Sequence, residues 1–482
     1  MGDSLRTPRR SLRSLCDFKR LKVLTTKLFS VHMTDSSTHP PSETPPRRLS
    51  PLSLKVNFAW TFLGNGLVAV CQLGLMALLW DKAGDATTGQ YIIALAISAP
   101  VFMFAGLDLR TLQATDSSGE VRFIEYLSLR LICGCFALAA VLLIAFAWGH
   151  RADTLAVIAG VGVGRFFLLI SDTFNGLMQK SERMDRVAHS IVLKGFLSTL
   201  VLGTTFVATG SLVMSVFAEA AARCLVLTFY DFPLGRQLAH EHGTETISLA
   251  SLRTVEPARL TKLTLRSLPL AFKVMLVSLD THVTRYIVSF PSMGGLSAVG
   301  VFGPIASGAG SASMVGKALN QSVSAKLGRL ATAGEPRPFV SFVRRLQLLY
   351  LVLGVAGVGF TVVAGGPLLA LVRPDALAYQ TLLTLVVVSV ALDLQNGIVD
   401  MSLVAARRIA PLAPACGLSV VTSALGCWLL IPSYGLSGAA MAMIAGRLMR
   451  MATLNVALTF ETRCSKAAST NSETVVPSRK AA

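Results

Sequence analysis

The sequence has few charged residues for its length, and few of those are acidic. Asp, Glu, Lys and Arg make up 15% of the 482 residues, and only 26 Asp and Glu stand against 44 Lys and Arg. Hydrophobic residues make up 52%, and the mean hydropathy is +0.61. Because about a quarter of the residues of a typical soluble domain are charged, this composition excludes an ordinary soluble protein.

Metal and redox motifs are also missing. The eight cysteines lie mostly inside apolar runs, where cysteine behaves as a small apolar residue, and Cys133 and Cys135 form an isolated C-x-C. The seven histidines are scattered, with His240 and His242 in a polar segment. We therefore expect no metal and no cofactor.

The first 50 residues contain no apolar run. They are rich in Arg, Ser and Pro, so they do not have the pattern of a cleaved secretory signal, and Met33 would serve equally well as a start. We predict a disordered basic cytoplasmic tail at 1–52 and a second disordered cytoplasmic tail at 463–482.

Long apolar runs fill most of the remaining chain. A helix of about 20 residues crosses a hydrocarbon core of about 30 Å. We predict an all-α integral membrane protein with twelve transmembrane helices, at 56–80, 89–109, 127–149, 154–179, 187–209, 211–230, 267–289, 296–316, 345–366, 378–404, 411–431 and 436–460.

The basic residues follow the topology that these spans define. Most of the Lys and Arg outside the spans lie in the two tails and in alternate loops on the same side, and only Lys82, Arg151 and Arg373 lie on the opposite side. This positive-inside pattern places both termini in the cytoplasm of a multi-pass plasma (inner) membrane protein. It explains the net charge of +18 without a nucleic acid partner.

An internal repeat relates the two halves of the chain. The polar segment at 232–262 separates an N-lobe at 53–231 from a C-lobe at 263–462. Three patterns recur in register: GQY at 89 with GVF at 300, DTFNG at 172 with DLQNG at 393, and AAAR ending at Arg223 with IAGR ending at Arg447. Six helices per half predict two parallel lobes around a central cavity, an architecture of transporters.

Three arginines lie deep inside predicted spans. Arg223 and Arg447 are ~16 to 18 Å from the outer ends of their helices, and Arg165 is at a similar depth. Buried charges in membrane proteins mark substrate pathways, and guanidinium groups bind phosphate or carboxylate, so we predict a cavity for an anionic substrate. Alternatively the arginines form structural pairs, such as Arg223 with Glu219 one helical turn away.

The seventh span, KVMLVSLDTHVTRYIVSF, carries Lys273, Asp280, His282 and Arg285. We predict that Lys273 faces the cavity and that Asp280 couples transport to H⁺ or Na⁺, with Glu219 as a second coupling or gating candidate. An ion pair that locks the helix is the alternative for Asp280. Lys194, on the cytoplasmic side of the fifth span, is predicted to capture an anion from that face.

Asp172 and Asp393 occupy the repeated D-x-x-N-G motif near the cytoplasmic ends of their spans. Such carboxylates can hold basic residues such as Lys180 or Arg407, while the glycine permits close helix contact. A gate between inward-open and outward-open states is the functional interpretation of the same motif.

Over residues 50–462 the chain resembles the polysaccharide flippases, Wzx-like lipopolysaccharide and O-antigen biosynthesis proteins, of the multidrug, oligosaccharidyl-lipid and polysaccharide exporter (MOP) superfamily. The resemblance rests on GQYIIALAISAPVFMFAGLDLRTLQATD, NGLMQKSERM, LDTHVTRYIVSF and PSYGLSGAAMA. It implies two six-helix lobes that move a polyprenyl-pyrophosphate-linked oligosaccharide from the cytoplasmic to the periplasmic leaflet by alternating access. Membrane lipids, a polysaccharide polymerase and glycosyltransferases are the implied partners.

Two other functions compete with this one. A multidrug or cation antiporter of the same superfamily would share the fold, but its cavity should be rich in carboxylates rather than arginines. An enzyme acting on lipid-linked sugars would need a sizeable extracytoplasmic loop, and the predicted outer loops are short. We therefore expect a transporter and not an enzyme.

Overall fold

The computed structural model describes most of the chain after the N-terminal tail, and all secondary-structure elements in this part are helices. The all-α prediction is therefore confirmed. The predicted N-terminal tail lies outside the described residues, as do His242 and Arg407. The described ranges are 54–115, 120–181, 183–241, 255–311, 313–332, 336–406, 408 and 410–473.

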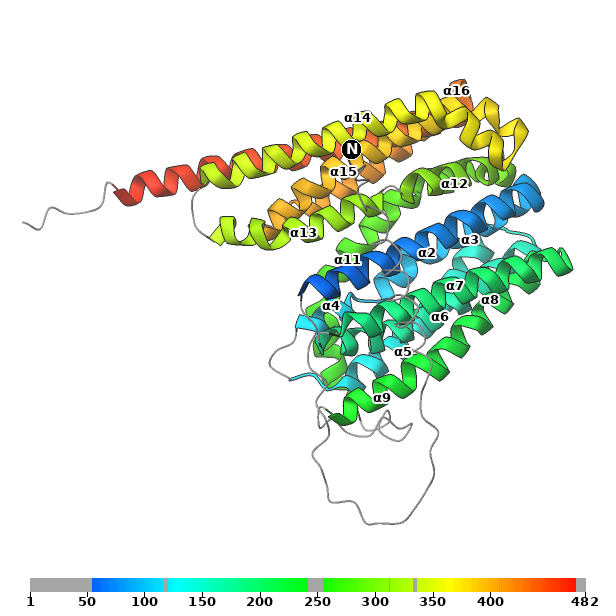
Figure 1. Ribbon diagram of the computed structural model, residues 1–482, viewed down its shortest axis with the longest axis horizontal. Helices are drawn as coiled ribbons and strands as arrows, with labels where there is room; N and C mark the ends of the chain where they lie inside the picture. Colours follow the sequence, from blue (N-terminus) through cyan, green and yellow to red (C-terminus); the bar gives the residue numbers. More distant parts are fainter. Residues whose placement is uncertain are drawn as a thin grey trace, which may run out of the picture. The chain divides into compact units, whose positions relative to one another are not determined.

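The first half of the chain contains the helices labelled α2 to α9 in Figure 1. The last three elements of this half follow one another without a break, and the first two of them correspond to the sixth predicted span. The bounds are α2 Leu54–Lys82, α3 Gly84–Ala105, α4 Leu109–Thr115, α5 Phe123–Ala147, α6 Ala152–Lys180, α7 Met184–Thr209, α8 Leu212–Val226, the π-helical turn η1 Leu227–Asp231 and α9 Phe232–Glu241.

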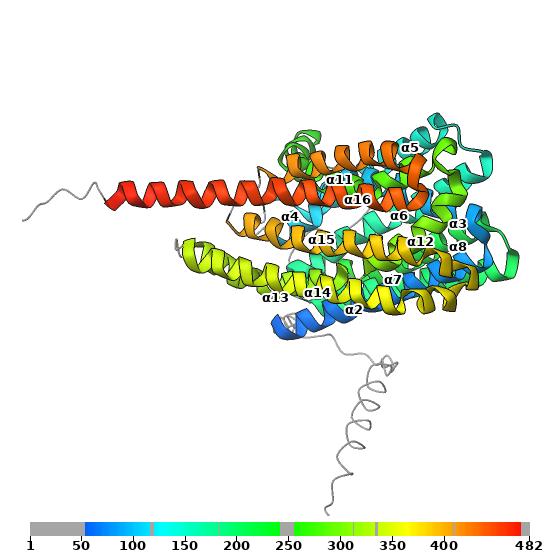
Figure 2. The same cartoon turned by 90° about the horizontal axis from the view of Figure 1, so that it is seen from above.

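The second half begins with α11, and its last helix runs past the ends of its neighbours in Figure 2. The bounds are α11 Pro257–Val288, η2 Pro291–Met293, α12 Gly295–Ser311, α13 Ser313–Thr332, α14 Pro336–Val372, η3 Pro374–Tyr379, α15 Gln380–Ala405 and α16 Leu412–Glu473. Helices α9 and α11 extend into the predicted interlobe segment from both sides. Helix α16 likewise extends into the range predicted as a C-terminal tail.

The helices account for the twelve predicted spans. Among the described residues, nine helices are long and apolar enough to cross a membrane by length and composition. The last of them includes two predicted spans, because its backbone leaves the helical conformation at Gly435, with φ 56° and ψ −138°. The other two spans are α11, which carries several charges, and α12, which has only 17 residues.

The two halves repeat one packing scheme and meet through a few helices. In the first half α6 contacts α3, α5 and α8, and in the second α15 contacts α14 and α16. Helices α11 and α12 of the second half pack against α3 of the first, and α12 also contacts α2. Figure 1 shows α12 beside α2 and α3, between the first-half helices and α13 to α16. The predicted two-lobe layout is consistent with these contacts.

The repeated Gly-x-aromatic motif marks the place where the halves touch. A Cβ at Gly89 of α3 would collide with the main-chain oxygen of Leu296, and a Cβ at Gly300 of α12 would collide with that of Asp85. Each glycine therefore permits the other half's backbone to approach closely. Small residues allow the same close packing in membrane helices generally.

We expect Gly300→Ala to destabilise the protein by about 1–3 kcal/mol, the usual cost of overpacking. The obstructing atoms belong to the backbone of α3, so the two helices must separate to relieve the collision. Thermal unfolding in detergent would measure the loss. Gly310→Ala is the matched control, since it lies in the same helix and its added Cβ meets nothing within 4 Å. Equal unfolding temperatures for the two variants would contradict the assignment.

A second contact joins the halves at the end that the charge pattern assigns to the outer side. Arg373, just before η3, donates Nη1 to Asp85 Oδ1 at 2.6 Å and to the main-chain oxygen of Trp80 at 3.4 Å. Further along α3, the Tyr286 hydroxyl of α11 donates to the main-chain oxygen of Ala96 at 2.5 Å. Both contacts link the second half to α2 or α3 and so help to hold the halves together.

Candidate functional site

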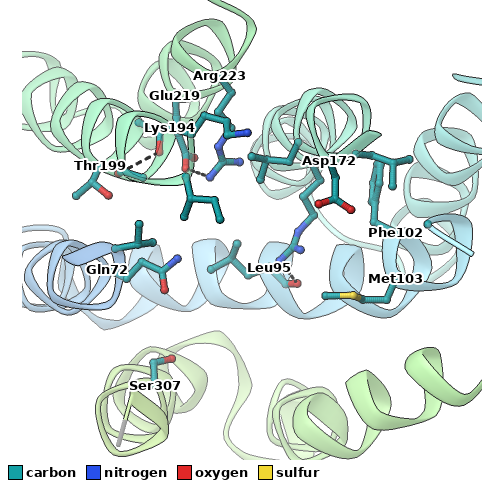
Figure 3. A pocket seen from close by; sticks show the side chains of 18 of the residues that line it. Gln72, Leu95, Phe102, Met103, Asp172, Lys194, Thr199, Glu219, Arg223 and Ser307 are labelled. Carbon is teal, nitrogen blue, oxygen red and sulfur yellow. Dashed lines mark hydrogen bonds and ion pairs between the residues drawn. The ribbon is translucent and has the colours of Figure 1, made fainter. Parts of the chain in front are cut away.

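A cavity of about 620 Å³ lies mainly against the first half of the chain. Helices α2, α3, α6, α7 and α8 form most of its wall, and α4, α5, α11 and α12 also contribute to it. Figure 3 shows Ser307 of α12 across the pocket from Glu219 and Arg223 of α8. Its lining contains more cationic than acidic side chains, namely Arg110, Arg130, Arg165, Lys194, Arg223 and Arg285 against Asp108, Asp172 and Glu219.

Arg165 and Arg285 have no acidic partner among the residues that the structure describes. Arg165 of α6 donates Nη2 to the main-chain oxygen of Leu95 at 3.3 Å. Arg285 of α11 donates to His282 Nδ1 at 2.9 Å and to Ser307 Oγ at 3.1 Å. No carboxylate in the described part of the chain lies within ion-pair distance of either guanidinium. The cavity wall therefore carries one uncompensated positive charge from each half.

Arg223 does have an acidic partner. It forms an ion pair with Glu219, four residues earlier on α8. This is the structural pair that the sequence suggested as the alternative to substrate binding. The Glu219 side chain is almost fully buried, whereas 14% of the Arg223 side chain is exposed. Gly164 of α6 leaves room for the guanidinium, because a Cβ there would lie 2.7 Å from Arg223 Nη1. Both residues line the cavity, so pairing and contact with a substrate are compatible.

Asp172 lies seven residues after Arg165 on α6, which places it on the same helix face and about 10 Å further along. It binds two arginines: Arg110 of α4 and Arg130 of α5, each at 3.1 Å. The sequence suggested a basic loop residue such as Lys180, and the partners are these two arginines instead. Arg130 is buried, so this cluster fixes α5 against α6.

Lys194 lines the cavity but is held by a buried acid. Its Nζ lies 3.1 Å from Asp231 Oδ2 and also contacts Ser171 Oγ. Ser190 Oγ donates to the other oxygen of Asp231 at 2.6 Å, and the carboxylate is fully buried. Ser171 Oγ also donates to Asp231, so three donors surround this carboxylate, which lies in the π-helical turn. Lys194 has less freedom to bind an anion than its position in the sequence indicated.

Arg447 and Asp280 are not among the residues that line this cavity. They form a buried network between α11, α15 and α16, in which Arg447 Nη1 lies 2.6 Å from Asp280 Oδ2. Arg450 lies 3.4 Å from the same oxygen and 2.5 Å from Asp400. Asp393, the repeat partner of Asp172, lies 3.4 Å from Arg447 Nε. This geometry is the ion-pair alternative that the sequence left open for Arg447 and Asp280.

Lys273 also lies outside the cavity lining, although its neighbour Val274 belongs to it. Lys273 is close enough to Asp400 for an electrostatic interaction. The charge of Lys273 thus adds to the C-terminal network rather than to the cavity wall.

Several residues of the site did not stand out in the sequence. Arg130 and Arg285 interrupt predicted spans, as Arg165 does, and that signal could have placed them in the site. Arg110 and Asp231 lie at span ends, where charge is ordinary, and only the fold brings Arg110 to the cavity and Asp231 to Lys194. Within the described ranges, no three His, Cys, Asp or Glu side chains are grouped so as to hold a metal ion.

No protein-family model matches the chain. A curated relative, the capsular polysaccharide biosynthesis protein CapF of Staphylococcus aureus, is 22% identical over 395 residues, which cover 80% of this chain and 94% of the relative. The resemblance to polysaccharide biosynthesis proteins that the sequence motifs indicated is thus confirmed.

Solved structures of transporters share the fold. An outward-facing multidrug resistance MATE family transporter of the MOP superfamily matches with a TM-score of 0.59, 14% identity and coverage of 86% of this chain and 97% of that chain. An inward-facing one matches with a TM-score of 0.57, 16% identity and coverage of 88% and 97%.

A further MOP superfamily transporter, from Pyrococcus furiosus, matches with a TM-score of 0.53, 15% identity and coverage of 86% and 96%. It is described as having a binding pocket of reverse polarity that suggests a different function. These structural neighbours show that the chain shares the fold of MOP superfamily transporters.

Proposed function

We propose that the protein flips a polyprenyl-pyrophosphate-linked oligosaccharide, a precursor of a surface polysaccharide, from the cytoplasmic to the periplasmic leaflet by alternating access. The observation that carries the proposal is a pair of guanidinium groups, Arg165 and Arg285, which line the cavity from different halves. Neither has a carboxylate partner in the described part of the chain. Buried cations without an acidic partner favour an anionic ligand.

The chemistry of the guanidinium group supports pyrophosphate in particular. Arginine presents a planar set of donors that matches the oxygens of phosphate in a bidentate manner. Arg165 and Arg223 come from one half and Arg285 from the other, so a single pyrophosphate could bridge the halves. The apolar part of the cavity wall, such as Leu73 and Met76 of α2, suits the adjoining lipid.

This function implies a location and partners. The positive-inside pattern supports the plasma (inner) membrane with cytoplasmic termini. Glycosyltransferases would supply the lipid-linked oligosaccharide on the cytoplasmic side, and a polysaccharide polymerase would consume it on the other side. The curated relative's name, a capsular polysaccharide biosynthesis protein, agrees with such a pathway.

A multidrug antiporter is the second candidate, because the structural neighbours include multidrug resistance transporters. Asp108, Asp172 and Glu219 line the cavity, but Asp172 and Glu219 are each bound to arginine. Asp108 accepts a hydrogen bond from the Thr111 hydroxyl and is the remaining lining carboxylate. A cationic drug would therefore meet one such carboxylate against Arg165 and Arg285, which have no acidic partner among the described residues. Like charges placed close together in a low dielectric repel strongly, so the lining disfavours a cation.

Reconstitution of the purified protein in liposomes separates the two functions. The probe is a polyprenyl-pyrophosphate-linked oligosaccharide with a fluorescent label on the glycan, and dithionite added outside reduces only labels in the outer leaflet. We expect the protein to expose inner-leaflet probe to dithionite, and ethidium to show no gradient-driven uptake. Ethidium transport without any movement of the lipid-linked probe would overturn the proposal.

A further inference from the structure

Glu219 is an acidic side chain inside a cavity that otherwise favours anions. Only 4% of its side chain is exposed, and it is bound to Arg223. The other charged or titratable groups that act on it are Arg165 of α6 and Tyr91 of α3. Glu219 therefore interacts with two of the three guanidinium groups assigned to the pyrophosphate.

A pyrophosphate bound to Arg223 and Arg165 would compete with Glu219 for the same donors. Arg223 presents its guanidinium to the cavity beside Gly164, and the Glu219 carboxylate that is bound to it lines the same cavity. If the anion takes these donors, Glu219 loses its counter-ion and gains a negative neighbour. A buried carboxylate without a cation is so costly that the group takes up a proton instead.

We propose that Glu219 is an internal counter-ion that the anionic substrate displaces, and that each binding event adds one proton to this carboxylate. The proton comes from water in the cavity and forms an O–H bond on Glu219. When the substrate leaves, Arg223 pairs with Glu219 again and the proton returns to water. This inference rests on the proposed function, since it requires an anion at Arg165 and Arg223.

If the anion displaces Glu219, its affinity for the protein must depend on pH, and the direction of this dependence can be stated. Protons are taken up on binding, so anions bind more tightly as the pH falls. With one proton per binding event, the dissociation constant changes by up to about tenfold per pH unit while Glu219 is ionised in the free protein and protonated in the complex. The same proton reduces the net charge that crosses the membrane with the substrate.

Calorimetry on the full chain in detergent tests the inference. The probe is methanedisulfonate, a dianion whose charge does not change over the accessible pH range, titrated in two buffers with different enthalpies of ionisation. We expect uptake of one proton by the unmodified protein, and none by Glu219→Gln, whose affinity should not vary with pH. Glu219→Asp, which keeps a carboxylate, should restore part of the proton uptake.

Glu125→Gln is the matched control, because Glu125 is also buried and paired with arginines but does not line the cavity. It should take up protons as the unmodified protein does. Binding of the dianion with no proton uptake, or with equal uptake by Glu219→Gln, would overturn the role of Glu219. Absence of any dianion binding at any pH would instead contradict the proposed function.

Discussion

Replacing Arg165 and Arg285 together by alanine is expected to abolish transport of a pyrophosphate-linked lipid while leaving the folded protein intact. A hydrogen bond to a charged group contributes about 1.5–3 kcal/mol, so each single variant should weaken dianion binding by roughly ten- to a hundredfold. Because the two residues come from α6 and α11, the double variant loses the contribution of both halves. The flipping assay and methanedisulfonate titration measure the two effects.

These alanine substitutions should not lower the stability of the protein, whereas removing one member of a structural ion pair would. Neither arginine has a carboxylate partner among the described residues, so neither substitution strands a buried negative charge. The unfolding temperature should therefore stay the same or rise slightly, since an uncompensated positive charge is removed. A fall of the unfolding temperature with unchanged transport would show that the two arginines act structurally.

Two controls make the result specific. Arg236→Ala removes an exposed arginine of α9, away from the cavity, and should change neither transport nor binding. Arg285→Lys keeps the charge but loses the planar set of donors, so binding should fall to an intermediate level. Full activity of the lysine variant would mean that charge alone, and not bidentate geometry, recognises the substrate.

Much of the fold could be predicted because a bilayer leaves the chain few choices. Every backbone polar group in the hydrocarbon must be satisfied within its own helix, so apolar length and the side of the basic residues define the spans. Even the turn inside α16 follows from Pro432 and Gly435 in PSYG. Helix ends were less predictable, because outside the hydrocarbon a helix such as α16 continues without an apolar signal.

The candidate site could be predicted only where a charge interrupts an apolar run. Arg165 and Arg223 were found in this way and do line the cavity. The same signal selected Arg447, but depth in the membrane does not reveal the direction of a side chain. Arg447 instead meets Asp280 and Asp393, which come from helices far away in the sequence. Such partners follow from tertiary packing, and no spacing within one span encodes them.

The two arginines at equivalent positions of the repeat, Arg223 and Arg447, have different surroundings. Arg223 pairs with Glu219 on its own helix and still faces the cavity, whereas Arg447 pairs with Asp280 on α11. The charges around Arg447 are thus paired within the second half. Arg285 differs from them, because it contributes a charge from the second half to the cavity wall.

Asp280→Asn is expected to destabilise the protein strongly. The carboxylate of Asp280 is shared by Arg447 and Arg450, and all three side chains are at least 94% buried. Removing one member of a buried ion pair costs about 3–5 kcal/mol. Without Asp280, Arg447 would keep only Asp393, at 3.4 Å and 43% exposed, and Arg450 would keep Asp400. Thermal unfolding in detergent should show this loss. Asp375→Asn, which breaks a pair with Arg373 whose acid is 63% exposed, should cost less than about 1 kcal/mol.

A double-mutant cycle separates this structural role from ion coupling by Asp280. Arg447→Gln alone should also destabilise, and the pair Asp280→Asn with Arg447→Gln should cost less than the sum of the single variants, because neither charge is then left without the other. If Asp280 couples transport to an ion gradient, its asparagine variant should keep its stability and lose the gradient response. An unchanged unfolding temperature with gradient-independent flipping would therefore support coupling and reject the structural assignment. A large loss of stability that Arg447→Gln partly relieves would assign Asp280 to the contact between α11 and α16.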